Sequence, residues 1–193
     1  MTTLKIILAS TRPGSSGPAI GHWIAERAGS TAFDTVETVD LAQVNLPFLD
    51  EPEHPKLGRY TQPHTFAWSR TIDEADVLVI VTPEYNGGFP APLKNALDFL
   101  HAEWRNKALG MVTYSGGPHG GTGAAAMLTP VTKALGLVTA DASVAIPRAA
   151  GRMVQGVFVA TDGENGLLSV MLDELETINR ELTPLRSRLA MAG

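Results

Sequence analysis

Short apolar runs, separated by amphipathic repeats, set the pattern of this chain. The run over 75–81 is apolar and β-branched without alternation, which is typical of a strand covered on both faces in the middle of a parallel sheet. Further strands are predicted over 4–9, 35–39 and 109–114. The pattern over 138–146 alternates between apolar and polar residues, which indicates an edge strand.

Helices are predicted between these strands. After the central strand, Leu93, Ala96, Leu97 and Leu100 repeat at i, i+3, i+4 and i+7, which forms one apolar face of a helix. Similar patterns predict a helix with the face Ile20, Trp23, Ile24 and Ala28, a short helix that begins near Phe66, and helices over 124–135 and 163–189. Strands that alternate with helices predict a doubly wound α/β fold. We expect a three-layer sandwich with a five-stranded parallel sheet, most simply in the order 2-1-3-4-5, as a single domain over 1–193.

Composition narrows the function classes. The chain has 193 residues, a net charge of −5 and no cysteine, so disulfides, thiol catalysis and Cys-ligated metals are excluded. Nothing indicates a nucleic-acid or anionic-membrane partner, and no run approaches the ~18 apolar residues of a membrane helix. His54 and His64 have no partner at metal-ligand spacing, so no metal is expected. We expect a cytoplasmic protein.

A hydroxyl-rich loop, Ser10–Pro18, lies between the first strand and the first helix. Free backbone N–H groups and the helix dipole at such a helix start favour an anion, and Arg12 could add a charge-assisted bond of about 1.5–3 kcal/mol. The alternative is a polar loop with a capped helix and no ligand. The loop lacks the Gly-Lys-Ser/Thr of P-loops and the G-x-G-x-x-G of dinucleotide sites. Asp40 lies where a ribose-binding acid would be expected, but an aspartate that ends a strand is the better interpretation.

Two more loops are predicted at the same edge of the sheet. Pro83–Phe89 follows the central strand, and the glycine-rich stretch Ser115–Gly121 follows the fourth strand. Glycine in such numbers usually means that something approaches the backbone closely. Strands 1, 3 and 4 adjoin in the predicted order, so the three loops suit a mononucleotide, which is FMN in flavodoxin-like sheets.

Three motifs carry a family resemblance. They are 9–14 (ASTRPG), 82–86 (TPEYN) running on to 90–98 (PAPLKNALD), and 114–117 (YSGG) with Gly120 and Gly121. With them the sequence resembles the NAD(P)H-dependent FMN reductase family of flavodoxin-like flavoproteins, which includes quinone, azo-dye and chromate reductases. The second motif is the most specific, and the resemblance covers nearly the whole chain.

The resemblance implies which residues hold FMN. Its phosphate would be held by Ser10, Arg12, Ser15 and Ser16. One side of the isoalloxazine would be lined by Pro83, Glu84, Tyr85, Asn86 and Gly87, and its pyrimidine end by Ser115, Gly116 and Gly117. Tyr85 has an apolar face and a polar tip that suit the ring, although a loop aromatic that covers the sheet end is the alternative.

The resemblance also implies the reaction. NADPH or NADH would pass hydride to FMN N5, and a small acceptor such as a quinone, an azo compound, a free flavin or a metal oxyanion would then take two electrons in a ping-pong mechanism. The flavin carries this chemistry, so no catalytic side chain is expected. His119 is a solvent-facing loop residue or, less favoured, a donor to the acceptor. A non-enzymatic flavin-binding or electron-transfer protein is the main alternative. A dehydrogenase binding NAD alone would leave the loop at 83–89 unused, and a serine hydrolase would need a Gly-x-Ser-x-Gly elbow that the chain lacks.

Assembly and access to the ring are further expectations. The family often forms a homodimer or homotetramer, for which 147–159, Phe89 and Trp104 are contact candidates, although packing within the chain would explain these residues equally well. Gly88, with Gly87, is expected to leave the ring open to many acceptors. The family also often has an arginine soon after the second glycine pair, whereas Thr122, Gly123 and Ala124 follow here, so an anchoring arginine is in doubt at this position.

Overall fold

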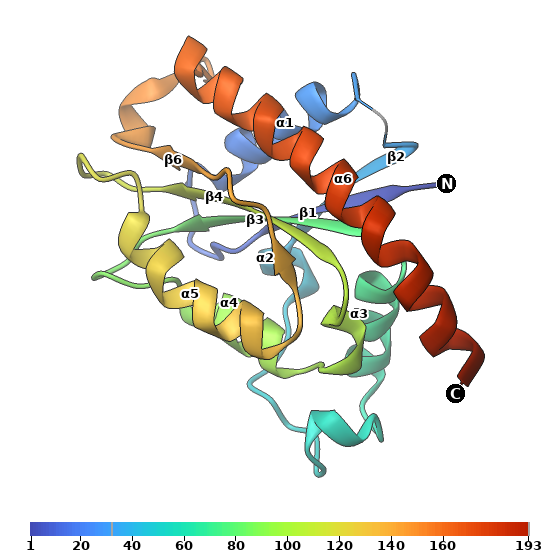
Figure 1. Cartoon of the computed structure of the whole chain (residues 1–193). Coiled ribbons are helices and arrows are strands. Elements are labelled where there is room, and N and C mark those ends of the chain that lie inside the picture. Colours follow the sequence, from blue (N-terminus) through green and yellow to red (C-terminus); the bar gives the residue numbers. More distant parts are fainter. Residues whose placement is uncertain (32, 193) are drawn as a thin grey trace.

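A parallel sheet forms the centre of the computed structural model, which describes residues 1–31 and 33–192 (Figure 1). Its strands lie in the order β2 (Thr35–Asp40), β1 (Thr3–Leu8), β3 (Val77–Pro83) and β4 (Ala108–Tyr114), followed by an edge made of β5 (Val138–Thr139) and β6 (Val144–Ile146). Each pairing in this sheet is parallel. The predicted order 2-1-3-4-5 and the flavodoxin-like arrangement are therefore confirmed.

The edge strand predicted as one element over 138–146 is broken into two. Thr139 pairs with Leu109 and Val144 pairs with Val112, so four residues of the edge oppose two residues of β4. The carboxylate of Glu174 accepts a hydrogen bond from Ala142 N at 2.9 Å, which satisfies one backbone group that the break frees. Breaks of this kind hinder edge-to-edge pairing with another chain.

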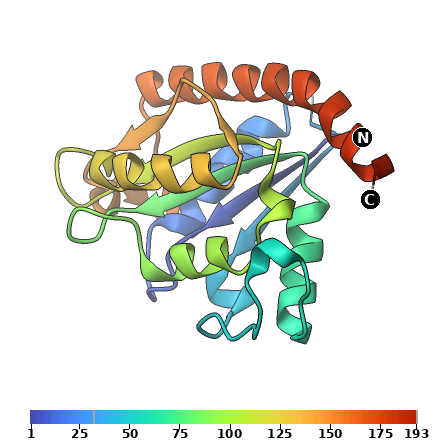
Figure 2. The same ribbon diagram turned by 60° about the horizontal axis from the view of Figure 1, so that its bottom comes forward.

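Helices cover both faces of the sheet (Figures 1 and 2). On one face α1 (Gly17–Ala28) and the long α6 (Asp162–Ala192) pack on alternate strand residues such as Leu4, Ile6 and Val79. On the other face lie α3 (Pro63–Asp73), α4 (Ala91–Asp98) and α5 (Thr122–Ala134). The central strand is buried at all seven positions, as its lack of alternation predicts. This is the expected three-layer sandwich.

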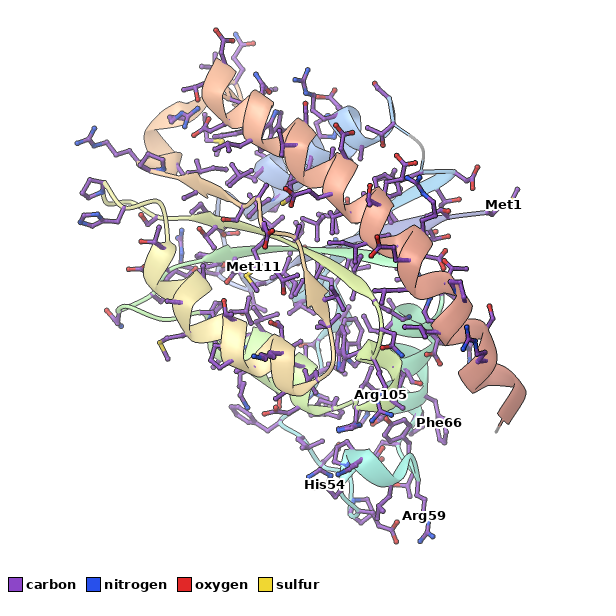
Figure 3. All side chains as sticks on the ribbon, in the orientation of Figure 1. Met1, His54, Arg59, Phe66, Arg105 and Met111 are labelled. Carbon is purple, nitrogen blue, oxygen red and sulfur yellow. The ribbon has the colours of Figure 1, made fainter. Side chains whose placement is uncertain are left out.

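Short elements complete the chain. They are α2 (Leu41–Val44), η1 (Pro55–Leu57), η2 (Ala102–Trp104), η3 (Ala149–Arg152) and a hairpin of β7 (Met153–Val154) and β8 (Val157–Phe158). Figure 3 places Met111 within the sheet, and His54 and Arg59 on the excursion that contains η1. Within the described residues, no helix has the length and apolarity needed to cross a bilayer.

Candidate functional site

Three loops meet at the carboxyl edge of the sheet because β1, β3 and β4 are parallel neighbours. The first loop (residues 9–16) joins β1 to α1, the second loop (residues 84–90) joins β3 to α4, and the third loop (residues 115–121) joins β4 to α5. Pro83 is the buried last residue of β3. The predicted site residues therefore lie on adjoining segments at one edge.

The first loop presents an open helix start. Ser16 is the N-cap of α1, but its side chain makes no capping hydrogen bond to a described residue, and the first turn of α1 contains no acid. Backbone N–H groups of Ser16 and Gly17 likewise have no partner within the described chain. Unpaired N–H groups and the positive end of the helix dipole converge here, which is the arrangement that binds anions. Arg12 lies exposed within the loop, with Nη1 donating to Pro13 O at 3.2 Å.

The second loop is a tight hairpin. Tyr85 N donates to Gly88 O at 2.8 Å and Gly88 N donates to Tyr85 O at 3.1 Å, so only Asn86 and Gly87 form the turn. Both have positive φ, 52° and 83°, as a type I′ turn requires, and Asn-Gly is the pair that tolerates this conformation best. The turn therefore projects from the sheet edge with its shape fixed by the backbone.

Hydrogen bonds join the second loop to both of its neighbours. The hydroxyls of Tyr85 and Ser10 are 2.8 Å apart, which links it to the first loop. Glu84 links it to the third loop and α5: its backbone N donates to Tyr114 O at 2.9 Å, and its carboxylate accepts from Gly123 N at 2.8 Å and Ala124 N at 3.3 Å. The carboxylate thus caps the N-terminus of α5, a role that the sequence analysis missed. A Cβ at position 123 would lie 2.9 Å from that carboxylate, so glycine at 123 leaves room for it.

The third loop uses its glycines in two ways. At Gly121, where φ is 88°, a Cβ would lie 2.9 Å from Tyr114 N, so the chain's own backbone is what approaches closely there. At Gly116 and Gly117, by contrast, an added Cβ would meet no described atom nearer than 3.9 Å. Ser115 Oγ donates to Gly117 O at 3.2 Å. Only the first glycine pair is therefore open to a ligand.

The segment that follows β6 holds the third loop through backbone hydrogen bonds. Arg148 N donates to Gly117 O at 3.0 Å, and Ala149 N donates to Ser115 O at 3.0 Å. Arg148 is exposed and has a φ of 50°, which is uncommon for a residue with a side chain. The structure thus brings an arginine to this edge from position 148, which sequence reasoning considered only as part of a contact surface.

Tyr114, the last residue of β4, belongs to the site although the sequence analysis named it only within a motif. Its side chain is 5% exposed, and its hydroxyl has no hydrogen-bond partner among the described residues. Burial raises the pKa of the Tyr114 hydroxyl to about 12, and interactions with the hydroxyls of Ser15 and Ser10, which fall short of hydrogen-bond geometry, offset part of this effect. The only sequence feature that could have identified Tyr114 as a site residue was its position, since it is an aromatic residue with a polar tip at the end of a predicted strand.

Three expectations about individual residues need correction or refinement. Trp104 is fully buried and donates to Leu97 O at 3.1 Å, so it cannot be a contact residue between subunits. Phe89 is only partly buried and packs on the core that α3, α4 and α5 cover. Gly88 is buried, with an added Cβ only 3.0 Å from Met127 Sδ, so the open glycine of this loop is Gly87.

Asp40 and His119 fall where the sequence analysis expected them, whereas His64 lies in a helix rather than in a loop. Asp40 accepts from Ala42 N at 2.9 Å as the N-cap of α2, which is a structural role. His119 is exposed on the third loop. His64 lies in α3, 2.9 Å from Asp50. Over the described part of the chain, no group of three or more metal-ligating side chains was found.

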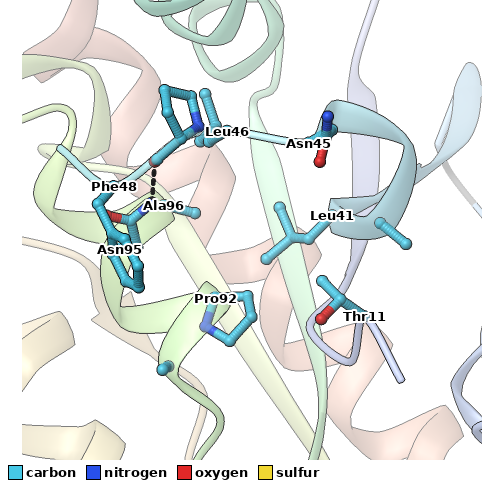
Figure 4. A pocket seen from close by; sticks show the side chains of 11 residues that line it. Thr11, Leu41, Asn45, Leu46, Phe48, Pro92, Asn95 and Ala96 are labelled. Atoms are coloured by element: carbon cyan, nitrogen blue, oxygen red, sulfur yellow. Dashed lines mark hydrogen bonds between the residues drawn. The ribbon is translucent and has the colours of Figure 1, made fainter. Parts of the chain in front are cut away.

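A cavity of about 450 Å³ adjoins the site on the side of α2 and α4. Its walls include Thr11 of the first loop, Leu41, Phe48 and Pro92 (Figure 4). Asn95 holds one wall in place, since its Nδ2 donates to Pro47 O at 2.6 Å and its Oδ1 accepts from Leu49 N at 3.0 Å. The cavity is thus a mostly apolar extension of the edge where the loops meet.

The chain is similar to several known oxidoreductases. A protein of Schizosaccharomyces pombe named NAD(P)H-dependent FMN reductase is 43% identical over 157 residues, which is 80% of this chain and 77% of that protein. A 2-hydroxy-1,4-benzoquinone reductase of a Burkholderia species is 32% identical over 108 residues, or 55% of this chain and 54% of its own. The solved structure of FerB, a flavoenzyme NAD(P)H:(acceptor) oxidoreductase of Paracoccus denitrificans, has the same fold, with a TM-score of 0.71 at 20% identity over 93% of this chain and 98% of its own.

The profile of the family described as NADPH-dependent FMN reductase matches residues 2–151, a range that contains all three loops. The resemblance inferred from the motifs is thereby confirmed, and with it the oxidoreductase class, the FMN cofactor and the NAD(P)H donor. This chain belongs to the NADPH-dependent FMN reductase family.

Proposed function

We propose that the chain acts as a single flavin-binding domain that holds FMN across the three loops and reduces a small acceptor with electrons from NADPH or NADH. One observation carries this proposal: the start of α1 has no side-chain cap and no acid in its first turn. Ser10 of the same loop is only 6% exposed. The residues present fit FMN, because an anion could satisfy the free N–H groups there and the open backbone at Gly116 and Gly117 leaves room for a flat ring.

The phosphate is assigned to the first loop, held by Ser10, Ser15 and Ser16 together with the N–H groups of the α1 start. Arg12 would contribute its charge from the exposed side. Because the helix has no competing acid in its first turn, its dipole remains available to the phosphate.

The ring is assigned to the second and third loops. Pro83, Glu84, Tyr85, Asn86 and Gly87 would line one side, with Glu84 acting through its backbone because its carboxylate caps α5. Ser115, Gly116 and Gly117 would face the pyrimidine end. The hydrogen bond between Tyr85 and Ser10 supports a role for Tyr85 in coupling the phosphate part of the site to the ring part.

FMN held by these residues would supply two-electron hydride chemistry at its N5, which NADPH or NADH and the acceptor would use in turn in a ping-pong cycle. The protein contributes binding, orientation and electrostatics. Backbone N–H groups at the pyrimidine end would favour negative charge on the reduced ring. The rigid turn at Asn86 and Gly87 would keep one side of the ring covered and leave the other side to the two substrates in succession.

The acceptor class we favour is a flat, apolar oxidant such as a quinone or an azo compound. The adjoining cavity supports this choice, because Leu41, Phe48 and Pro92 give it apolar walls next to the first loop. Replacement of Phe48 by alanine should raise KM for a quinone several-fold and leave FMN affinity unchanged. An unchanged KM would remove the cavity from the acceptor site.

We also propose a cytoplasmic homodimer or homotetramer. The absence of cysteine is compatible with a reducing compartment. Exposed Val154, Val157 and Val159 on and beside the β7–β8 hairpin support self-association through this segment. Light scattering of the wild type and of Val157→Glu tests this, since a charge on a contact surface should shift the mass towards the monomer.

The experiment that tests the phosphate assignment is Ser16→Asp. Aspartate is a good N-cap and favours the helix dipole, so the flavin-free variant should be at least as stable as the wild type. The same negative charge should repel a phosphate and weaken FMN at least about tenfold, or by about 1.4 kcal/mol, while riboflavin, which lacks the phosphate, should bind as before. Unchanged FMN affinity would contradict the assignment. For the reaction, initial rates with NADPH and a quinone should give parallel double-reciprocal lines, and intersecting lines would contradict the ping-pong cycle.

A further inference from the structure

One buried polar atom at the site has no partner. The Tyr114 side chain is 5% exposed, yet its hydroxyl makes no hydrogen bond to any described residue. Buried hydroxyls are almost always paired, because leaving a donor unsatisfied costs free energy. Such an exception therefore calls for a partner that the chain itself does not supply.

The surroundings of this hydroxyl indicate where that partner lies. A Cβ built on Gly17, the first residue of α1, would be 3.2 Å from Tyr114 Oη and 3.6 Å from Ser15 Oγ. The hydroxyl therefore lies at the open start of α1, beside the first loop and the unpaired N–H groups described above. Because position 17 is glycine, no side chain of that residue packs against the hydroxyl.

The chemistry at this point favours an anion with several acceptor oxygens. Burial raises the pKa of the Tyr114 hydroxyl to about 12, so the group stays protonated and remains a donor at neutral pH. The polar groups around it are the hydroxyls of Ser15, Ser10 and Tyr85 and the guanidinium of Arg12. The carboxylate of Glu84, the acid of the second loop, accepts from the start of α5 instead.

We propose that Tyr114 donates a hydrogen bond from its hydroxyl to the phosphate of the bound flavin nucleotide, and that this bond helps the protein to select FMN over riboflavin. The inference rests on the proposed function, since it assigns the phosphate to the same end of the site. It adds a phosphate ligand from β4, the strand that also leads into the loop assigned to the ring. The end of β4 would thus contact the phosphate, and the third loop, which follows it directly, would contact the ring.

Tyr114→Phe tests this, because it removes only the oxygen. Binding titrations of the flavin-free, full-length chain should show an FMN dissociation constant about tenfold higher than that of the wild type, as expected for a lost bond to a charged group. The riboflavin constant should stay within about twofold of the wild-type value. Inorganic phosphate should compete with FMN less well in the variant. The flavin-free variant should melt at the same temperature as the wild type or higher, because an unsatisfied buried donor has been removed.

Tyr60→Phe is the matched control. The Tyr60 hydroxyl donates to Glu103 at 3.0 Å, and neither residue lies on the three loops. This variant should melt at a lower temperature and keep the wild-type ratio of FMN to riboflavin affinity.

The possible outcomes separate the two proposals. If the wild type binds FMN and Tyr114→Phe keeps the wild-type ratio, or weakens both flavins equally, the inference is overturned while the proposed function stands. A lower melting temperature of flavin-free Tyr114→Phe would mean that the hydroxyl is already bonded in the empty protein, which also overturns it. If the wild type binds no FMN, the proposed function fails first.

Discussion

Glu84 offers the sharpest test of how the site is held together. Its carboxylate accepts from two backbone N–H groups at the start of α5 while its own backbone begins the second loop. Replacement by alanine leaves both N–H groups without that acceptor and removes a negative charge from a helix N-terminus. Losing such a cap costs about 0.5–2 kcal/mol, and losing the charge at the dipole costs about 0.3–1 kcal/mol more. We therefore expect Glu84→Ala to lower the free energy of unfolding by about 1–3 kcal/mol.

The change should also reach the cofactor. Without the carboxylate, the second loop loses one of its attachments to the third, so the two loops assigned to the ring should be less well ordered relative to each other. FMN affinity should fall more than tenfold in Glu84→Ala and less in Glu84→Gln, which keeps one acceptor oxygen. Urea unfolding of the flavin-free chain and FMN titration measure the two effects separately.

Glu51→Ala controls for loss of a capping carboxylate away from the site. Glu51 accepts from Thr61 N at 2.8 Å and Gln62 N at 3.0 Å near the start of α3. Glu51→Ala should lose about as much stability as Glu84→Ala but keep the FMN affinity of the wild type. If Glu84→Ala binds FMN as tightly as the wild type, the link between the two loops does not position the site. If it loses no stability, the carboxylate does not cap α5.

Three further predictions follow from single contacts. Burial lowers the pKa of Lys107 to about 8, whereas a lysine of the unfolded chain has a pKa of about 10.4. Between these two pH values the unfolded state therefore binds more protons than the folded state. Lys107 should thus make the free energy of unfolding rise with pH, by up to about 1.4 kcal/mol per pH unit. Urea midpoints between about pH 8 and about pH 9.5 should show this rise in the wild type and a smaller one in Lys107→Met, and equal slopes would refute it. Asn95→Asp removes the hydrogen-bond donor to Pro47 O, so limited proteolysis should cut the loop around residue 47 faster than in the wild type. An unchanged cleavage rate would mean that Asn95 does not hold this loop in place. Gly121→Ala should lower the free energy of unfolding by more than about 1 kcal/mol, because Gly121 has a positive φ and a close backbone contact. Gly116 has open space around it, so Gly116→Ala should unfold like the wild type. Equal effects of the two substitutions in denaturant unfolding would contradict this contrast.

Much of the fold could be predicted because the signals are local. The unbroken apolar run at 77–81 requires cover on both faces, and the repeat from Leu93 to Leu100 requires a helix on the sheet. The break in the edge strand was missed because it depends on Glu174 of α6, more than 30 residues away. The two interpretations of Trp104, subunit contact and packing within the chain, could not be separated for a similar reason: the sequence does not reveal that its indole donates to Leu97 O inside the core.

The candidate site was predicted as a set of loops rather than as a network. Local sequence placed Ser16 before a helix and Asn86 and Gly87 in a loop after the central strand, and the structure agrees with both. It could not show that the Glu84 carboxylate caps α5 or that the Tyr114 hydroxyl is orphaned at the start of α1. Both facts depend on how distant segments pack, and both changed which residues we expect to matter.

The central claim is that the three loops together form the FMN site. A crystal structure of the chain grown with FMN tests it most directly. The account predicts the phosphate against the start of α1, within hydrogen-bonding distance of Ser16 and Tyr114, with the ring over the turn at Asn86 and Gly87 and its pyrimidine end at Gly116. FMN found elsewhere on the molecule, or with its phosphate away from the first loop, would contradict it.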